Sequence, residues 1–461
     1  MEKTKFTHRL IARIVIEAVT PLSVGSGEDD ITTDALVAID ANGLPYIPGT
    51  SIAGILRHAI GEDQAEKFFG KNGSYSTQDN GRGSEIIFTE ARMLGPDGNV
   101  IDGLQTIDFE DDFFKHFKNL PIRQHVRIDH RGTSESGGKF DQQVVYKGTR
   151  FCFEIEMVAT NNDTQQFDKV LSHIHSDAFY LGSNTRSGLG KMRVVNCETK
   201  RLDLSNQTDL EFYIEKSSRL DTNSWHGNTF VAEELSNWTK IELQLQPQDF
   251  FLIGTGIGDD DVDITPVKES YLSYEKGAFI DCCTLIPGSS IKGALSHRTA
   301  FHYNRLKKLF ADNISSPNDP GLPVGKNNLA VRALFGSEGI EVNKKMKYQL
   351  RGNVLIGDIL KEDVQPNKTF NHVAINRFTG GAIDGALFSE KVIGKNNEDT
   401  YHTTIFINKE GVQDTAQDET EIVMKAFYAA LDDLCNGMLP LGGGVNRGHG
   451  TFFGFYKGGN E

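Results

Sequence analysis

Two aspartates lie at matching positions along the chain, and a carboxylate is a side chain of the type that can bind divalent metal ions. Asp34 comes seven residues after Gly27, and Asp263 comes seven residues after Gly256. An aspartate can orient a hydroxyl group, or help to hold a metal ion that stabilises an in-line displacement at phosphorus. An aspartate in an acidic loop is more often only solvated. The competing acidic residues are Asp29, Asp30 and Asp40 in the first loop, and Asp260 and Asp261 in the second.

Each of these loops leads to a motif that occurs twice. Residues 46–57 read YIPGTSIAGILR, and residues 285–296 read LIPGSSIKGALS. Pro-Gly forms a turn, the following Ser or Thr can cap a helix, and the apolar spacing after it is helical. The hydroxyl groups, N–H groups and charges at such a helix start suit phosphate. The candidates here are Ser51, Arg57, Ser289, Ser290 and Lys292; Ala53 stands where the second copy has Lys292.

A third matched pair combines imidazole, guanidinium and aromatic groups. Residues 125–132 read HVRIDHRG, and residues 372–380 read HVAINRFTG. We expect a hairpin with a long, mobile tip, because Gly- and Ser-containing polar stretches follow and then an alternating strand. Its side chains are either solvated or contact phosphates and bases, with an aromatic ring able to wedge between bases. The candidates are His125, Arg127, Arg131, His372, Arg377 and Phe378.

The last matched pair is rich in glycine: LGSNTRSGLGK at residues 181–191 and LGGGVNRGHGT at residues 441–451. A dinucleotide site is disfavoured, because these glycines precede a strand instead of joining a strand to a helix. Two interpretations stay open. The loops are structural turns, or their bare backbone N–H groups and side chains approach phosphates closely. The candidates for the second interpretation are Arg186, Lys191, Asn446 and Arg447.

Four matched elements in the same order indicate a tandem duplication. Strand patterns at residues 9–24 and 240–253 begin the two copies, and helical patterns at 165–178 and 419–434 precede the glycine-rich loops. Each copy therefore reads strand, helix, strand, long hairpin, helix, strand. We predict an α+β fold of two tandem domains in the ferredoxin-like order that RNA-recognition modules also use. The predicted domains span residues 1–215 and 236–461, with a linker at about 205–235.

Composition narrows the choice of partners and compartment. The net charge of −15 argues against a nucleic-acid partner unless the 48 Lys and Arg residues gather on one face. Five cysteines form no C-x-x-C pair, which favours reduced thiols over a zinc site. The chain contains no apolar run near the ~20 residues of a membrane span, and its N-terminus lacks the layout of a signal peptide. We expect a cytoplasmic protein without a membrane partner.

The repeated I-P-G-[TS]-S-I-x-G motif, the glycine-rich loop before the last strand and the order of elements resemble the RAMP superfamily. More narrowly, the chain is similar to backbone subunits of type III CRISPR effector complexes, and its two copies resemble the fused subunits of subtype D. The resemblance implies binding to guide RNA, to complementary target RNA and to other subunits. It also implies target cleavage at intervals of about six nucleotides along the guide–target duplex. Asp34 and Asp263 would be catalytic and hold a divalent metal, Mg²⁺ or Mn²⁺.

Two other functions compete with this one. The chain is a scaffold that binds guide RNA and cuts nothing, or a stand-alone endoribonuclease that processes guide RNA. The second alternative is disfavoured, because no motif of the chain contains a His–Tyr–Lys set.

Overall fold

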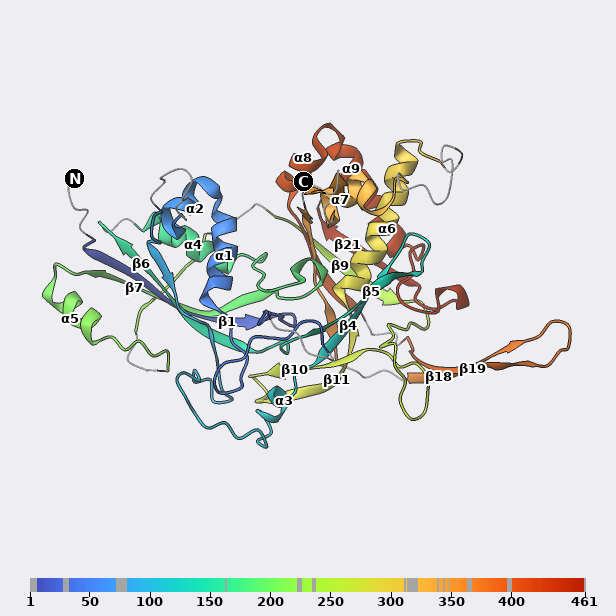
Figure 1. Ribbon diagram of the computed structural model, residues 1–461, viewed down its shortest axis with the longest axis horizontal. Helices are drawn as coiled ribbons and strands as arrows, with labels where there is room; N and C mark the ends of the chain where they lie inside the picture. Colours follow the sequence, from blue (N-terminus) through green and yellow to red (C-terminus); the bar gives the residue numbers. More distant parts are fainter. Residues whose placement is uncertain are drawn as a thin grey trace.

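The protein is described by a computed structural model in which two similar halves lie side by side (Figure 1). The described residues are 6–27, 33–71, 81–161, 164–221, 226–233, 238–310, 312, 322–337, 340–342, 345–347, 349–362, 367–395 and 400–459.

The first half is built on one antiparallel sheet. Its strands follow the order β2-β6-β1-β7-β8, and β3 also pairs with β6. The helices α1, α2 and α4 lie over one face of this sheet (Figure 1). The elements are β1 (His8–Ala18), α1 (Gly49–Ile60), α2 (Glu62–Phe69), β2 (Ile86–Phe88), β3 (Arg92–Met93), α3 (Lys115–Lys118), β4 (Ile122–Ile128), β5 (Ser134–Gln143), β6 (Arg150–Ala159), α4 (Gln165–His175), η1 (Thr185–Ser187), β7 (Met192–Asp203), α5 (Gln207–Glu215) and β8 (Asn228–Thr229).

The second half repeats this plan. Its main sheet has the order β16-β20-β9-β21, with antiparallel neighbours, so its first strand again lies between the strand after the hairpin and the last strand. The helices α6 and α9 pack against it. The elements are β9 (Thr239–Pro247), β10 (Lys268–Ser273), β11 (Ala278–Ile286), α6 (Gly288–Leu306), η3 (Gly325–Asn327), α7 (Leu329–Phe335), β12 (Gly336–Ser337), β13 (Ile340–Val342), β14 (Lys345–Lys347), β15 (Leu350–Arg351), β16 (Val354–Ile356), β17 (Ile359–Lys361), β18 (Asn367–Ile375), β19 (Ala382–Ile393), β20 (Tyr401–Ile407), α8 (Lys409–Ala416), η4 (Gln417–Glu419), α9 (Thr420–Cys435), η5 (Val445–Arg447) and β21 (Phe452–Gly458).

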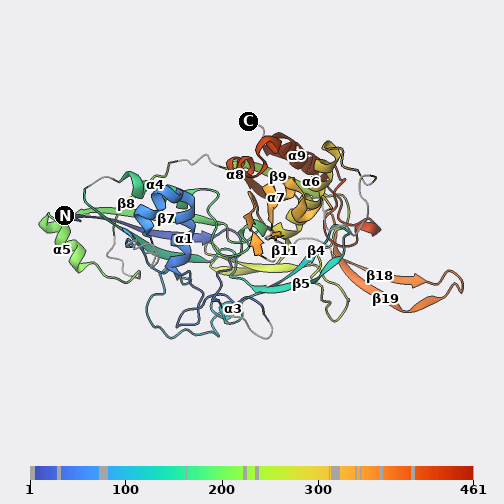
Figure 2. The same ribbon diagram turned by 45° about the horizontal axis from the view of Figure 1, so that its top comes forward.

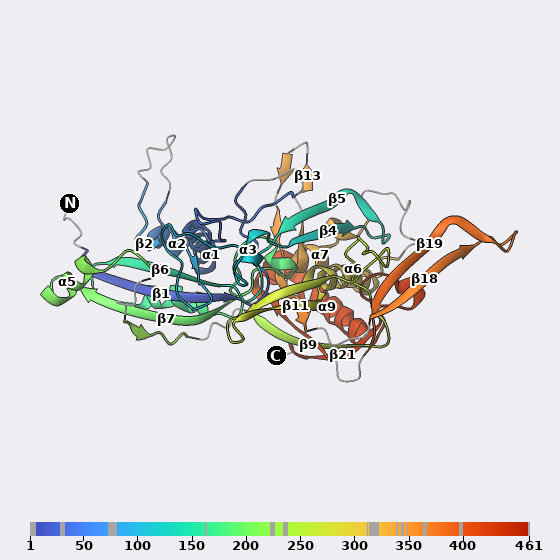
Figure 3. The ribbon, with the colours of Figure 1, turned by 90° about the horizontal axis from the view of Figure 1, so that it is seen from below.

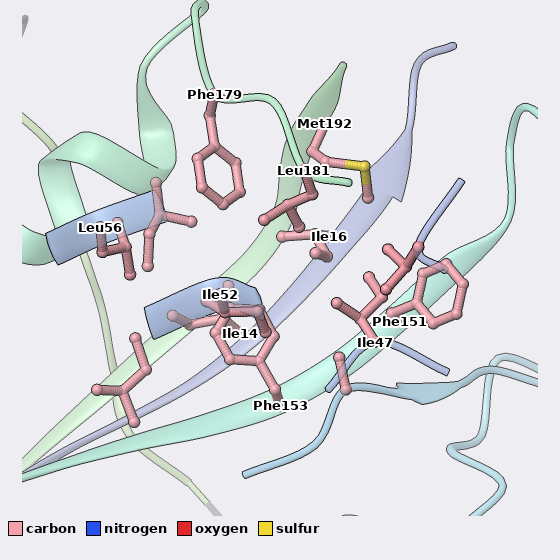
Figure 4. Packing of buried hydrophobic residues seen from close by; sticks show 14 of the residues in the cluster. Ile14, Ile16, Ile47, Ile52, Leu56, Phe151, Phe153, Phe179, Leu181 and Met192 are labelled. Atoms are coloured by element: carbon pink, nitrogen blue, oxygen red, sulfur yellow. The ribbon is translucent and has the colours of Figure 1, made fainter. Parts of the chain in front are cut away.

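Alternation along the first strand and helical spacing after the I-P-G motif build the core of the first half. Ile14 and Ile16 of β1 point toward the helices, where Ile52 and Leu56 of α1 meet them together with Phe153 of β6 (Figure 4). All five side chains are fully buried. Burial of a large apolar side chain stabilises a fold by about 1.5–3 kcal/mol. The repeated motif therefore packs its helix onto the sheet and leaves the polar start of the helix at the edge.

The expected hairpins are present, but their form corrects the sequence analysis. The Gly- and Ser-containing stretches after the histidine motifs belong to the returning strands β5 and β19, so only residues 129–133 and 376–381 form the tips. Strand β4 contacts the second half, whereas the end of the β18–β19 hairpin projects away from the rest of the protein (Figure 3).

The loop at residues 254–284 of the second half contains strands that the sequence analysis did not predict. It contains β10 and most of β11, which form a sheet with β17. Figure 2 shows β11 between the two halves. Leu272 of this hairpin belongs to the core of the first half, and its backbone N–H donates to the carbonyl oxygen of Lys147 at 2.8 Å. The ring of Phe279 stacks on His116 at 3.8 Å between centroids. The inserted hairpin thus fastens one half to the other.

The segment expected to be a linker also carries structure. Helix α5 packs on the outer face of the first sheet, and β8 pairs with β7 at its edge. The domain limits 1–215 and 236–461 stay a prediction. In the part of the chain that the structure describes, no helix is both long and apolar enough for a membrane crossing.

Candidate nucleic-acid interface

The two candidate aspartates occupy corresponding positions in the two halves. Asp34 accepts a hydrogen bond through Oδ2 from the backbone N–H of Asp141 at 2.9 Å. Asp263 accepts one through Oδ2 from the backbone N–H of Ser389 at 2.7 Å, and another from its hydroxyl at 3.0 Å. The residue after each aspartate forms a parallel bridge with the same hairpin strand, β5 or β19. Each aspartate therefore lies where the loop after the first strand meets the base of the hairpin.

Both aspartates are exposed, so a ligand can reach them. The hydrogen bonds from Ser389 hold the pKa of Asp263 below its ordinary value, which keeps that carboxylate ionised at neutral pH. Their roles stay predictions.

The competing acidic residues have different surroundings. The side chain of Asp40 is mostly buried and accepts hydrogen bonds from the backbone N–H groups of Asn42 and Leu44. It therefore stabilises the turn that these residues form. Asp260 and Asp261 are exposed, and within the described ranges neither side chain forms a hydrogen bond or ion pair with the hairpin. Asp29 and Asp30 lie outside the described residues.

The oxygen atoms at these positions suit a hard divalent cation only in part. Within the described ranges, no group of three or more His, Cys, Asp or Glu side chains could hold a metal. In the first half, Oδ1 of Asp141 is buried and has no hydrogen-bond partner among the described residues, although the backbone N–H of the same residue contacts Asp34. The second half has a serine at this position. A divalent ion would therefore need water or phosphate oxygens for most of its ligands, which is how Mg²⁺ is commonly bound.

A histidine stacks on a phenylalanine at the base of each hairpin. His125 faces Phe140 and His372 faces Phe388 across the strands, with ring centroids 4.8 and 4.7 Å apart. Burial lowers the pKa of His125, and its buried Nε2 atom has no hydrogen-bond partner in the part of the chain that the structure describes. Nε2 of His372 lies 2.8 Å from an oxygen of Glu390. The two imidazoles are thus similarly placed, but only the second contacts a carboxylate.

The glycine-rich loops join the hairpins next to these histidines, and the two halves make this connection differently. In the second half, the fully buried Glu390 accepts a hydrogen bond from Arg447 at 2.6 Å and lies 3.4 Å from Nε2 of His449. In the first half, Gln142 forms the corresponding parallel bridge and accepts a hydrogen bond from the side chain of Asn184. The loop of the second half is therefore held by charge, and that of the first half by neutral groups.

The sequence analysis missed four residues of these sites: Asp141, Gln142, Ser389 and Glu390. A cross-strand register for each hairpin would have placed them near the histidines. Asp141 and Ser389 contact the loop aspartates, and Gln142 and Glu390 bridge to the residues that follow those aspartates. These contacts join segments more than 100 residues apart in the chain, and no local pattern reports them.

Three cations gather where the glycine-rich loop of the first half meets the second half. Nε of Arg186 donates to the carbonyl oxygen of Gly352 at 2.7 Å. Burial, followed by the charge of Arg351, lowers the pKa of Arg186 to about 9. Burial, followed by the charge of Arg186, lowers the pKa of Lys292 to about 8. Among the described residues, none of the three cations pairs with a carboxylate, so an anion bound here would offset the cost of burying them.

The other candidates at the helix starts and this junction differ in role. Ser51, Ser289 and Ser290 lie half-buried in the first turns of α1 and α6. The side chain of Arg57 donates to the carbonyl oxygen of Gly70 at 2.9 Å, which closes the end of α2. Nζ of Lys191 lies 4.8 Å from the ring centroid of Phe406 in the other half. Arg57 and Lys191 therefore already take part in intramolecular contacts.

The remaining candidates are exposed. Arg127 lies 3.9 Å from Glu135 near the tip of the first hairpin, and Arg131 lies in its turn. Arg377 and Phe378 form the tip of the second hairpin, where the side chain of Phe378 is 99% exposed. Asn446 is exposed in η5. The two hairpin tips thus present cations and one aromatic ring, at positions far from the aspartates in the sequence.

Comparison with known proteins identifies the family. The family model of the RAMP superfamily matches residues 15–193 and 283–452, which together make up more than half of the chain. The chain belongs to the RAMP superfamily. The two matched regions are consistent with tandem RAMP domains, and membership implies binding to CRISPR RNA within a multi-subunit complex. No curated protein matches the sequence.

Proposed function

We propose that this protein is a backbone subunit of a type III CRISPR interference complex, with two fused RAMP domains as in subtype D. It binds guide RNA along both halves and cleaves complementary target RNA at two sites about six nucleotides apart, one per half, with base pairing to the guide selecting the target. The observation that carries the proposal is the equivalent placement of Asp34 and Asp263, each at the base of a hairpin that carries a stacked histidine.

We also propose that each half is a ferredoxin-like domain. The order of the first sheet supports this, because β1 lies between β6 and β7 and β2 pairs with β6, all antiparallel. In this scheme the helices cover one face, and the hairpin is inserted between the second and third strands of the domain.

The cations at the junction would bind the backbone of the guide. Arg186, Lys292 and Arg351 are half-buried or exposed and lie near the start of α6, where their positive charges favour phosphate. Phosphate contacts fix the register of a nucleic acid without reading its sequence. This agrees with a subunit that leaves sequence recognition to the guide.

At each cutting site, the carboxylate would act where the hairpin displaces the target strand. Asp34 with Asp141, or Asp263 with Ser389, would supply oxygen ligands to Mg²⁺ or Mn²⁺. The bound ion would offset negative charge that develops at phosphorus. The hydrogen bonds from the hairpin strand fix the direction of each carboxylate before RNA arrives, which limits the reorganisation needed during reaction.

A scaffold that binds guide RNA without cutting is the second candidate. The observation that favours it is the engagement of Asp263: one carboxylate oxygen already accepts two hydrogen bonds from Ser389, which compete with a metal ion for that oxygen.

Cleavage of end-labelled target RNA by the reconstituted complex tests the proposal. Asp34→Ala and Asp263→Ala should each remove one product and leave the other, and the double variant should remove both. Omission of magnesium should have the same effect as the double variant. Guide and target binding, measured in parallel, should stay within about twofold of the unaltered complex, since each change removes a single exposed carboxylate.

Asp261→Ala is the matched control, because Asp261 is exposed in the same loop and its side chain forms no hydrogen bond or ion pair with the described residues of the hairpin. It should leave both products intact. Unchanged cleavage in all the variants would leave the scaffold as the function of this chain. Loss of the second product with Asp261→Ala, but not with Asp263→Ala, would move the second site to the competing residue.

A further inference from the structure

The outer faces of the two sheets, opposite the helices, are covered differently. In the first half, the segment after β7 crosses this face. Phe212 and Tyr213 of α5 pack over Ile11 and Leu202. Farther along the same segment, Leu220 packs against Cys152 and is only 5% exposed. The first sheet is therefore covered on both faces by its own chain.

Polar contacts fix this covering segment around Leu220. Nζ of Lys216 lies 2.8 Å from Oε2 of Glu154, a buried carboxylate of β6. The side chain of Arg13 on β1 donates to the carbonyl oxygen of Arg219 at 3.3 Å. The cover thus combines an apolar side chain that enters the face with a basic side chain that pairs with an acid of the sheet.

Among the described residues, nothing covers the corresponding face of the second sheet in this way. In β1 and β6, Val15 pairs with Cys152 beneath Leu220. The equivalent pair in β9 and β20 is Gln244 and His402, at the same distance from the glycine turn that follows each first strand. Instead of a covering leucine, this place holds an open hollow of about 390 Å³. The residues that line the hollow include Glu242, Gln244, His402, Thr404, Phe455 and Lys457.

The open face continues the contact between the two halves. Phe406 of β20 is buried there against Tyr180 of the first half. Thr404 and His402 follow on the same side of β20, where the cover ends. On the edge strand β21, which pairs with β9, Phe453 and Phe455 are 47% and 48% exposed. An exposed aromatic pair beside a hollow is typical of a binding surface.

We propose that this surface, defined by Glu242, His402, Thr404, Phe453 and Phe455, binds a polypeptide segment of another protein subunit. The segment places an apolar side chain in the hollow and a basic side chain beside Glu242. It does for the second sheet what residues 216–220 do for the first. The proposal goes beyond RNA binding and cleavage and does not depend on the roles of the aspartates.

The charges favour a polypeptide over RNA. Glu242 presents an exposed carboxylate to the hollow. Nζ of Lys240, the nearest cation on the same strand, lies 3.0 Å from that carboxylate and 3.8 Å from Asp177. Phosphates need unpaired cations, and both lysines of this face, Lys240 and Lys457, interact with the carboxylate of Glu242 and lower its pKa. Among the described residues, the face differs in this respect from the junction of Arg186 and Lys292.

Protection of a cysteine in the hollow tests the proposal. Cys282 is the exposed one of the five cysteines, so Thr404→Cys would be introduced together with Cys282→Ser. The rate of maleimide labelling at position 404 would be compared in the isolated chain, in the chain with guide RNA, and in the complex purified natively through a tag on this chain. We expect labelling at least about tenfold slower in the complex alone, which corresponds to about 1.4 kcal/mol of protection. Equal rates in all three states, or full protection by RNA alone, would overturn the proposal.

A change of charge gives a second, independent test. Glu242→Arg should reduce recovery of the protein subunits with this chain at least about tenfold, while guide-RNA affinity stays unchanged. Glu275→Arg is the matched control, because it makes the same change at an exposed turn away from the hollow. Equal recovery with both variants would overturn the proposal. Loss of guide RNA with Glu242→Arg but not with Glu275→Arg would assign this face to RNA and would also overturn the proposal. Failure of the unaltered chain to bind guide RNA would instead count against the proposed function, so the two failures are distinguishable.

Discussion

Arg123 makes the strongest polar contact between the two halves, and its replacement by methionine gives a sharp test of how they are joined. Its side chain is 7% exposed. The guanidinium bonds both carboxylate oxygens of Glu269 and, at 2.6 Å, Oδ2 of Asp358; both acids belong to the second half. Arg123→Met leaves two buried carboxylates without a counter-charge, so we expect a loss of about 3–5 kcal/mol in unfolding free energy.

The pH dependence of this loss follows from Asp358. Burial raises its pKa above the ordinary value, although Arg123 opposes the shift. Without Arg123 the pKa rises further. A carboxyl whose pKa is higher in the folded than in the unfolded state favours folding at low pH, and this contribution is lost as pH rises through the folded value. The destabilisation by Arg123→Met should therefore be larger at pH 8 than at pH 5.

Urea unfolding, followed by the fluorescence of Trp238, measures the effect at the junction. Trp238 packs against the cluster of Tyr180, Leu355 and Phe406 between the halves, and Trp225→Phe would remove the other tryptophan.

Arg193→Met is the control for the same chemical change. Arg193 is 60% exposed and pairs with Glu17 at 2.6 Å, so its loss should cost less than about 1 kcal/mol. If Arg123→Met costs no more than Arg193→Met at pH 8, the buried pairing does not hold the halves together and the reasoning is wrong.

Three further predictions concern the loops at the junction and the sites. Glu390→Gln gives the second half the residue type that the first half has at Gln142, and it weakens a charged hydrogen bond to the glycine-rich loop. We expect a loss of about 1.5–3 kcal/mol in unfolding free energy and a selective slowing of the second cut, read from the product ratio. An equal effect on both cuts would contradict the assignment. Gly188 has φ +110°, and a Cβ there would lie 2.0 Å from a buried carboxylate oxygen of the other half. Gly188→Ala should therefore speed proteolysis between the halves, whereas the control Gly54→Ala, whose Cβ meets no atom within 4 Å, should not. Equal rates of proteolysis for the two variants would show that this close approach is unimportant. The pKa of Lys292 is lowered to about 8, so its charge is lost as pH rises through that value. Guide-RNA affinity should therefore fall between pH 7 and 9 at constant salt, and Lys292→Met should flatten this dependence. An unchanged pH profile in that variant would refute a phosphate contact by Lys292.

Local patterns in the sequence predicted the repeated framework correctly. Alternation along residues 9–24 and 240–253 reports which side chains of a strand face the core, and both stretches contain the first strand of a sheet. The spacing of Ile52 and Leu56 likewise places a helix on that sheet. These signals are local because a strand or helix needs one continuous apolar face. The β10–β11 hairpin escaped prediction because its apolar residues pack in the other half of the chain, far from it in sequence.

The sequence by itself determined that the chain is a duplication, that each copy has its hairpin and glycine-rich loop in the same order, and that one aspartate follows each first strand at the same interval. Only the tertiary structure decided which groups surround those aspartates. It placed Asp141 beside one and Ser389 beside the other, buried Arg186 and Lys292 at a shared junction, and left one outer sheet face open. The physical reason is that hydrogen bonding and burial depend on contacts between distant segments, and these contacts give two similar motifs different electrostatic surroundings.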